Sequence, residues 1–277
     1  ARDTGIKVHL GSLMSICSRK FAELAEAFQV LKGRIVYRGD ITRDEVGAPA
    51  VFQDLAASPS SIQATNANIA YGMVPGHKTT AADAVKAYIQ SMLKSKHPTW
   101  IELPRELWPK AWNGKFTRPV VLLIKALYGH PESGAHWEAH LEAIVRDLGG
   151  KPVNNHPSSY FFKKTGLLLT VYVDDLLLSG PADAHEAFWA ALRPKVDLEE
   201  VTGLERFLGR GHDEVNIDGT RALAFNMQEY AQSSVDLYLS LPGSKSLKKA
   251  STPFLPEGAL LASDDDSKGE LAPVACK

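Results

Sequence analysis

The stretch LLLTVYVDDLLLSG (residues 167–180) places two adjacent aspartates, Asp174 and Asp175, inside a run of aliphatic residues. A buried carboxylate without a partner is costly, and two neighbouring carboxylates also repel each other. One interpretation is a β-hairpin whose turn happens to contain two aspartates. The other is a divalent-metal site presented at the tip of that hairpin. The neighbouring sequence is needed to distinguish a simple turn from a metal site.

The composition describes an ordinary globular chain. Its 277 residues are 44% hydrophobic and 23% charged, and the formal net charge is −1. That length suits one large domain or two or three lobes. No apolar run reaches the roughly 18 residues of a membrane span, and no signal peptide is visible at the start. The two cysteines, Cys17 and Cys276, form neither a disulfide framework nor a zinc cluster, so we expect a reducing, intracellular compartment.

The segments next to the aspartate pair predict a small sheet with packed helices. SYFFKK and LLLTVYV are β-rich runs joined by Thr165-Gly166, and LLLSG pairs back after the aspartates. Upstream, the residues that follow HPESG (residues 130–134) predict a helix that is stopped by Gly149-Gly150. Downstream, Pro181 opens a second amphipathic helix. The buried face of the upstream helix is expected to comprise Trp137, Leu141, Ile144, Val145 and Leu148.

Within residues 78–94, a helical pattern of apolar residues begins after Asp83. The residues that follow it repeat at helical spacing, which predicts a helix with one buried face. Asp83 stands just before that pattern, where it could cap the helix or meet its positive end. The same position also suits a strand-to-helix transition, from which a side chain can point out of a sheet. The apolar residues of this pattern are Val85, Tyr88, Ile89, Met92 and Leu93.

The remaining segments predict further helices and strands. Residues 18–28 and 227–241 are helical in pattern, and residues 33–40, 120–129, 204–215 and 221–226 resemble strands. SSIQATNANIAYGMV predicts a helix capped by Ser60 or Ser61, with Ile62, Ile69 and Met73 on its buried face. Everything after Pro242 reads as extended or disordered. The order of elements predicts an α+β fold with helices on one face of the sheet.

Phosphoryl transfer to a polynucleotide end requires positioning and charge stabilisation, and two divalent cations about 3.5–4 Å apart supply both. Magnesium prefers hard oxygen ligands, so the protein has to offer carboxylates that converge from different strands. A pair at a hairpin tip and a third at the end of a neighbouring strand meet this need. Asp174, Asp175 and Asp83 fit it. His130, His136 and His140 lack the partners of a zinc site.

At this point the chain resembles a known family. YVDD (residues 172–175) looks like the metal-binding signature of reverse transcriptases. Further segments are similar to motifs of copia-type retrotransposon polymerases, in the same order along the chain. These segments are LKGRIVYRGD, ADAVKAYIQS, ALYGHPESGAHWEAHL, LERFLG, LAFNMQEYAQSSVDLY and ASTPFLPEG. The resemblance covers residues 7–260 and identifies the chain with the reverse transcriptase region of a copia-type Pol polyprotein.

The resemblance implies a right-hand polymerase with an antiparallel palm sheet backed by helices. Residues 1–75 would be mostly fingers, and residues 76–220 the palm with part of the fingers. Residues 221–250 would form a partial thumb, and residues 251–277 a flexible tail. The implied reaction is RNA-directed DNA synthesis, in which deoxynucleotides are added to a primer 3′-hydroxyl.

The resemblance also implies roles for individual residues. Asp83, Asp174 and Asp175 would be catalytic and hold two Mg²⁺ ions, with Mn²⁺ as the alternative metal. The residues expected to bind the incoming nucleotide are Lys32, Arg34, Tyr88, Tyr128 and Gly129. The residues expected beside the primer and template are Tyr172, Phe207, Leu208 and Gly209. Taken alone, Tyr88 also fits a core position, and Lys32 and Arg34 fit a solvated strand face.

Implied partners are a template–primer duplex, deoxynucleoside triphosphates, and the ribonuclease H and integrase modules of the polyprotein. The expected location is cytoplasmic, in particles, or nuclear, without a membrane. Two features depart from the family pattern, because HPESGAHWE carries no Lys or Arg and Ala84 follows Asp83. One alternative is therefore a degenerate, inactive remnant that binds nucleic acid. Another is a different metal-dependent phosphotransferase or a structural domain.

Overall fold

The computed structural model describes residues 5–20, 29–52, 57–244 and 246–247. The helix expected over residues 18–28 and the tail expected over residues 251–277 lie largely or wholly outside this part. Backbone contacts divide the chain into two compact units, Ala1–Asn226 and Met227–Lys277. The division falls a few residues after the expected start of the thumb at residue 221. In the second unit, the described helix is α5 (Gln228–Ser240), as the sequence predicts.

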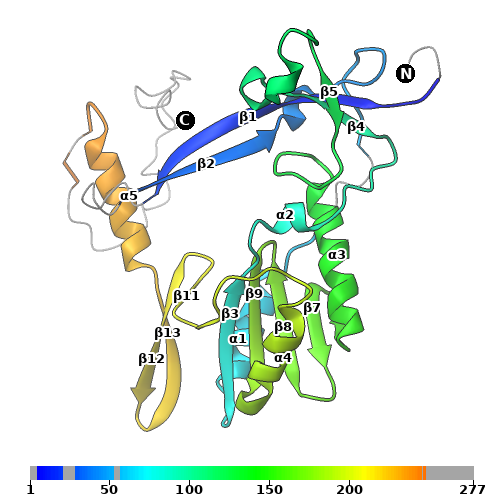
Figure 1. Cartoon of the computed structure of the whole chain (residues 1–277). Coiled ribbons are helices and arrows are strands. Elements are labelled where there is room, and N and C mark those ends of the chain that lie inside the picture. Colours follow the sequence, from blue (N-terminus) through cyan, green and yellow to red (C-terminus); the bar gives the residue numbers. More distant parts are fainter. Residues whose placement is uncertain (1–4, 21–28, 53–56, 245, 248–277) are drawn as a thin grey trace, which may run out of the picture. The chain divides into compact units, whose positions relative to one another are not determined.

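The largest sheet of the first unit has six strands in the order β10-β3-β9-β8-β7-β6. Every neighbouring pair in it is antiparallel. Its strands are β3 (His77–Asp83), β6 (Lys151–Val153), β7 (His156–Phe162), β8 (Leu167–Tyr172), β9 (Asp175–Pro181) and β10 (Thr202–Gly203). The predicted hairpins on both sides of LLLTVYV are therefore confirmed, and they form the middle of this sheet (Figure 1).

Among the described residues, two smaller sheets and four α-helices accompany this sheet in the first unit. One sheet has the order β2-β1-β4-β5, in which β1 and β4 are parallel, and the other has the order β11-β12-β13. Their strands are β1 (His9–Lys20), β2 (Val30–Tyr37), β4 (Thr99–Glu102), β5 (Val120–Leu122), β11 (Arg206–Phe207), β12 (Arg210–Ile217) and β13 (Thr220–Asn226). The helices are α1 (Ile62–Gly72), α2 (Ala87–Gln90), α3 (Ser133–Asp147) and α4 (His185–Leu192).

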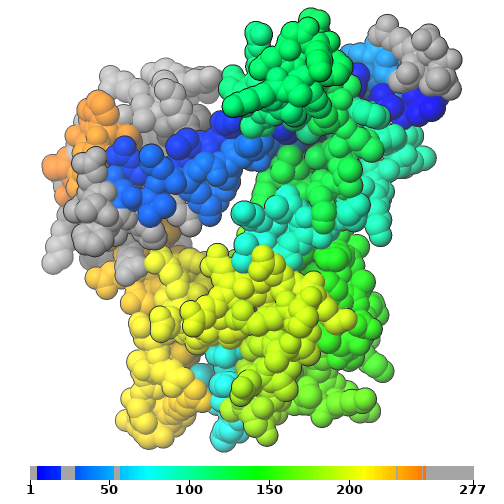
Figure 2. Space-filling view, in the orientation of Figure 1, coloured from blue at the N-terminus to red at the C-terminus, as the bar shows by residue number. Residues whose placement is uncertain are grey.

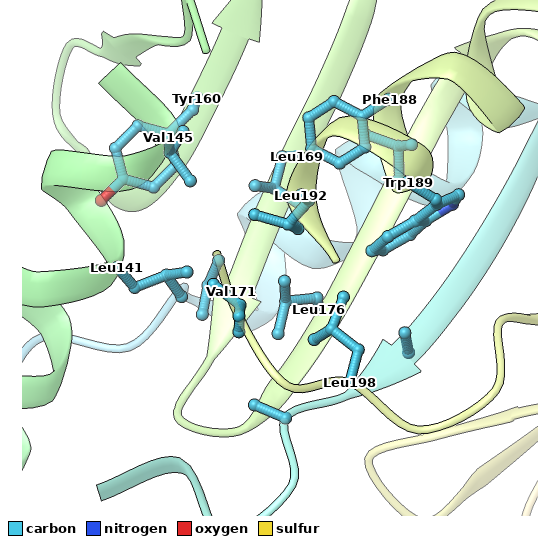
Figure 3. Packing of buried hydrophobic residues seen from close by; sticks show 14 of the residues in the cluster. Leu141, Val145, Tyr160, Leu169, Val171, Leu176, Phe188, Trp189, Leu192 and Leu198 are labelled. Atoms are coloured by element: carbon cyan, nitrogen blue, oxygen red, sulfur yellow. The ribbon is translucent and has the colours of Figure 1, made fainter. Parts of the chain in front are cut away.

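The six-stranded sheet has helices on both faces, so the expectation that helices cover one face is wrong. In β9, Leu176, Leu177 and Leu178 are all fully buried. Leu176 and Leu178 pack with α3 and α4, whose contributions to this cluster Figure 3 shows in part. Leu177 packs on the other face with Ile69 of α1. A strand with consecutive buried residues needs both faces covered, and the pattern of β9 already carried that information.

Helix α1 begins as predicted, and Ile69 is buried as expected, but the rest of its buried face differs from the prediction. The Ser61 hydroxyl caps it by accepting a hydrogen bond from the Ala64 amide at 3.1 Å. Ile62, expected in the core, is 63% exposed, whereas Thr65 and Asn68 are fully buried. Asn68 can occupy the buried face because it hydrogen-bonds to groups of β8 and β9, and the Thr65 hydroxyl pairs with the Ser60 hydroxyl. By packing, α1 belongs with the six-stranded sheet.

The helix expected after Asp83 is a second correction. Strand β3 continues to Asp83, and α2 is a four-residue turn. Lys86 adopts a left-handed conformation with φ of 50°, which ends any helix there. The backbone of the segment pairs instead with distant chain, since the Val85 amide donates to the Asp197 carbonyl at 2.9 Å. Such tertiary pairing overrides a helical pattern that the sequence carries locally. In Figure 2, cyan surface borders yellow-green surface in the lower half of the view.

Candidate active site

The three predicted aspartates meet at one end of the six-stranded sheet. Asp83 is the last residue of β3, and Asp175 is the first residue of β9. The two lie directly opposite each other in the antiparallel register. Asp174 occupies the turn between β8 and β9, and its carbonyl accepts a hydrogen bond from the Ala84 amide at 2.7 Å. Carboxylates that are far apart in the sequence thus converge at one hairpin tip.

The site carries negative charge without local compensation. Burial raises the pKa of Asp175 to about 7, and the charges of Asp83 and Asp174 and a hydrogen bond to Asp83 act in the same direction. No lysine or arginine of the described chain forms an ion pair with any of these three aspartates. A cation at this tip would relieve the repulsion between the carboxylates.

The donors suit a hard divalent cation, because they are carboxylate oxygens from two strands and a turn. In the described residues, however, no three His, Cys, Asp or Glu side chains already form a complete ligand group. The tip therefore offers hard oxygen donors but not a complete ligand group among the described side chains. Magnesium tolerates such a sparse protein shell because it keeps several waters.

Two hydrogen bonds hold the turn that carries Asp174. One is the bond from the Ala84 amide. The other comes from α3, where the Trp137 indole N–H donates to the Val173 carbonyl at 2.7 Å. Trp137 is 2% exposed, so its predicted place in the helix core is confirmed. Its link to the turn was missed, because helical spacing says nothing about where an indole N–H points.

The rings of two predicted site residues, Tyr88 and Tyr128, pack against each other near the aspartates. The rings of Tyr88 and Tyr128 have centroids 4.4 Å apart with an interplanar angle of 38°. Burial raises the pKa of both hydroxyls, and the nearby negative charge of Asp174 raises both further. The positive charge of Arg34 opposes this rise in the pKa of Tyr128. Asp174 therefore lies close enough to act on both tyrosines, and Arg34 of β2 lies close enough to act on Tyr128.

Gly129 allows the loop after β5 to dock against β2. Its φ is 89°, and a Cβ at this position would lie 2.0 Å from the Tyr37 carbonyl oxygen. The Tyr37 amide donates to the Tyr128 carbonyl at 2.8 Å. Any side chain at residue 129 would push the loop away from the end of β2. The glycine thereby keeps Tyr128 beside the strand that carries Arg34.

The other predicted site residues lie in different surroundings. Lys32 lies two residues before Arg34, on the same face of β2. Tyr172 pairs with Asp175 at the end of β8 and is 38% exposed. Phe207 is 5% exposed and packs in a hydrophobic cluster, so its ring faces the core. Leu208 and Gly209 form the left-handed turn between β11 and β12, with φ of 48° and 76°.

Comparison with known proteins finds similarity to yeast retrotransposon polyproteins. The transposon Ty1-DR1 Gag-Pol polyprotein of Saccharomyces cerevisiae is 24% identical over 234 residues, which is 83% of this chain. The chain is a distant relative of retrotransposon polyproteins. The truncated transposon Ty1-A Gag-Pol polyprotein of the same yeast is also 24% identical over 234 residues. The transposon Ty1-GR3 Gag-Pol polyprotein is 25% identical over 191 residues, or 68% of the chain.

The aligned region is a small part of each retrotransposon polyprotein. It makes up 12% of the Ty1-DR1 polyprotein, 18% of the truncated Ty1-A polyprotein and 10% of the Ty1-GR3 polyprotein. No family model matches the chain. Within the described residues, no helix is both long enough and apolar enough to cross a membrane.

Proposed function

We propose that the chain is the RNA-directed DNA polymerase region of a copia-type retrotransposon polyprotein. The observation that carries this proposal is the register that sets Asp83 opposite Asp175, with Asp174 in the adjoining turn. The distant relationship to Ty1 Gag-Pol polyproteins supports it independently. In the proposed right-hand architecture the six-stranded sheet is the palm, β1 and β2 belong to the fingers, and α5 to a partial thumb.

Asp83, Asp174 and Asp175 hold the catalytic magnesium ions in this proposal, with Mn²⁺ as the alternative. When bound, these ions supply charge stabilisation at the attacking and leaving oxygens. The carboxylates fix where that charge sits, and the two hydrogen bonds to the turn keep Asp174 in place. Because burial and the neighbouring carboxylates raise the pKa of Asp175 to about 7, a metal ion would compete with a proton for this carboxylate near neutral pH.

In the proposed complex, the nucleotide lies between the aspartates and the packed rings of Tyr88 and Tyr128. Arg34 and Lys32 bind the triphosphate, for which a guanidinium is well suited through its paired donors. Tyr88 lies under the sugar, and Tyr128 with Gly129 supports Tyr88 from the side. Because the Phe207 ring is buried, a primer contact in that region would come from the exposed turn after it.

The proposed partners follow from the reaction. They are an RNA or DNA template with its primer, deoxynucleoside triphosphates, and the ribonuclease H and integrase modules of a polyprotein. The proposed location is a cytoplasmic particle or the nucleus.

Primer extension tests the proposal directly. Purified protein is given an oligo(dT) primer on a poly(rA) template, deoxythymidine triphosphate and Mg²⁺, and labelled product is measured. We expect extension by the wild type and its loss in Asp83→Asn and Asp174→Asn. Asp183→Asn, at an exposed position outside the tip, is the matched control and should extend normally. Full extension by a pure, folded Asp83→Asn protein would contradict the proposal.

A second candidate function is a remnant that binds template and primer without extending the primer. The observation that favours it is the lack, among the described residues, of a complete metal-ligand group. The same experiment separates the two when duplex binding is measured in parallel by fluorescence anisotropy. Binding without extension by the wild type, in Mg²⁺ and in Mn²⁺, would support the remnant.

A further inference from the structure

Val173, the residue before the aspartate pair, has a strained backbone. Its φ is 59°, in the left-handed region. A β-branched side chain rarely adopts that conformation, because Cβ approaches the following carbonyl oxygen. Such a conformation persists only where the surrounding structure holds it. The question is therefore which contact holds the Val173 peptide in place.

A side-chain contact to that peptide comes from the indole of Trp137. Its N–H donates to the Val173 carbonyl at 2.7 Å, and the ring is anchored in α3 with 2% exposure. A cavity of about 30 Å³ adjoins the turn and is lined by Trp137, Val173 and Tyr88. On the far side of the turn, the Ala84 amide holds the Asp174 carbonyl. In addition to the Tyr172–Asp175 strand pair that closes the hairpin, the turn is thus held by one hydrogen bond on each side.

We propose that Trp137 is a positioning residue for the aspartate pair. Its indole N–H holds the strained Val173 peptide and so sets the direction in which Asp174 and Asp175 leave the turn. The kinetic consequence rests on the proposed polymerase function, whereas the structural consequence does not. A purely structural role for Trp137 would alter stability alone.

The kinetic test compares Trp137→Phe with Trp189→Phe. The Trp189 indole also donates a buried hydrogen bond, to the Thr80 hydroxyl at 2.9 Å, and lies in the same hydrophobic cluster. The control therefore loses a similar ring and a similar bond away from the turn. For Trp137→Phe we expect kcat to fall about tenfold, with KM for the deoxynucleotide changed less than about twofold. For Trp189→Phe we expect kcat close to the wild-type value.

Replacement of Trp137 by β-(3-benzothienyl)alanine keeps the shape of the indole and removes its N–H. This isostere replaces Trp137→Phe in the kinetic test if that variant does not fold. It should lower kcat about as much as is expected for Trp137→Phe. Val173→Gly provides a rescue, because glycine adopts a positive φ without strain. In a double-mutant cycle, Trp137→Phe should then lower kcat less in the Val173→Gly background than in the wild type.

Hydrogen exchange at the Ala84 amide reports on the turn without activity, since this amide donates to the Asp174 carbonyl. We expect about tenfold faster exchange in Trp137→Phe and no change in Trp189→Phe. Equal exchange in the two variants, or equal kcat, would overturn the positioning role. If the wild type extends no primer while Ala84 exchange responds to Trp137→Phe alone, the polymerase proposal fails and the positioning of the turn stands.

Discussion

At the scale of single residues, Asp175 has an unusual acid–base balance. Its neighbours and its burial raise its pKa from 3.8 to about 7. The folded state therefore binds this proton more tightly than the unfolded state does. The stability that the proton provides is present at low pH and is lost as the pH rises from about 4 to 7.

We expect Asp175→Asn to be more stable than the wild type above pH 7 when no divalent cation is present. The gain in unfolding free energy should be on the order of 2 kcal/mol, allowing for the partial solvent exposure of the carboxyl group. Near pH 4 the two proteins should be similar. Urea denaturation at pH 4 and pH 8 measures this, with Asp183→Asn as control. A less stable Asp175→Asn protein at pH 8 would show that the carboxylates do not repel each other as described.

Tyr88 separates a sugar-binding role from a core role. If its ring lies under the incoming sugar, Tyr88→Ala should raise ribonucleotide incorporation relative to deoxynucleotide incorporation. Tyr88→Phe keeps the ring that stacks on Tyr128, so its discrimination should match the wild type. A core role instead predicts a loss of about 3–5 kcal/mol in stability for Tyr88→Ala, with the ratio unchanged. The ratio of incorporation efficiencies in the three proteins decides between these roles.

At the scale of elements, α1 is fastened to the sheet by one buried amide. The Asn68 Nδ2 atom lies 3.1 Å from the Leu168 carbonyl, the Thr170 hydroxyl and the Leu177 carbonyl. A single side chain therefore connects the helix to both β8 and β9. These are the two strands that flank the aspartate turn.

We expect Asn68→Ala to lower the free energy of unfolding by about 1–3 kcal/mol, because it leaves strand acceptors without their donor. Asn66→Ala on the same helix is the matched control. Its side chain is only partly buried and accepts one hydrogen bond, from Arg210 at 3.1 Å. Urea denaturation should give a clearly smaller loss for the control. Equal losses in the two variants would mean that helix propensity, and not the buried amide, is responsible.

Elements with a strong local pattern could be predicted from the sequence. The hairpins around LLLTVYV follow from β-rich runs and a Thr-Gly turn, and helix α3 follows from its apolar period and its glycine stop. The segment after Asp83 could not be predicted in the same way. Its residues have a helical period, but the Val85 amide bonds to the Asp197 carbonyl, more than a hundred residues away. Pairing between distant parts of the chain cannot be recognised from a short stretch of sequence.

Some features of the candidate site could be predicted from the sequence, and others could not. The convergence of Asp83 with the aspartate pair was expected from motif resemblance, because strand register over such a separation cannot be read from one sequence. The Trp137 hydrogen bond and the burial of the Phe207 ring depend on side-chain direction in three dimensions. Residue type and spacing do not encode either of these directions.

At the scale of the whole molecule, buried histidines make the fold sensitive to acid. Burial lowers the pKa of His9, His130, His185 and His212, and that of His130 falls to about 4. The Nδ1 atom of His130 accepts a hydrogen bond from the Glu132 amide at 3.2 Å, which requires the unprotonated nitrogen. The stability that a neutral His130 provides is complete above pH 6.5 and is lost as the pH falls toward 4.

Protonation of Asp175 adds stability as the pH falls, and we expect the four buried histidines together to outweigh it. The free energy of unfolding of the wild type should then fall between pH 7.5 and pH 4.5, with His130 contributing up to about 3 kcal/mol. His130→Gln should show a correspondingly smaller difference between the two pH values. His156→Gln, at an exposed position, should keep the wild-type difference. Denaturant titrations at both pH values measure this. An undiminished difference in His130→Gln would assign the acid sensitivity to the other buried histidines.

The two aspartates at the hairpin tip also matter before the chain has folded. They are the only charged residues between Lys164 and Asp183, and the stretches on either side are rich in leucine and valine. Uncharged stretches with high β-propensity drive intermolecular cross-β association, and an interrupting charge suppresses it. Combined Asp174→Asn and Asp175→Asn should therefore scatter more light on dilution from urea than Asp183→Asn does. Equal scattering would contradict this, whereas the expected result would mean that even a chain without polymerase activity gains solubility from keeping both carboxylates.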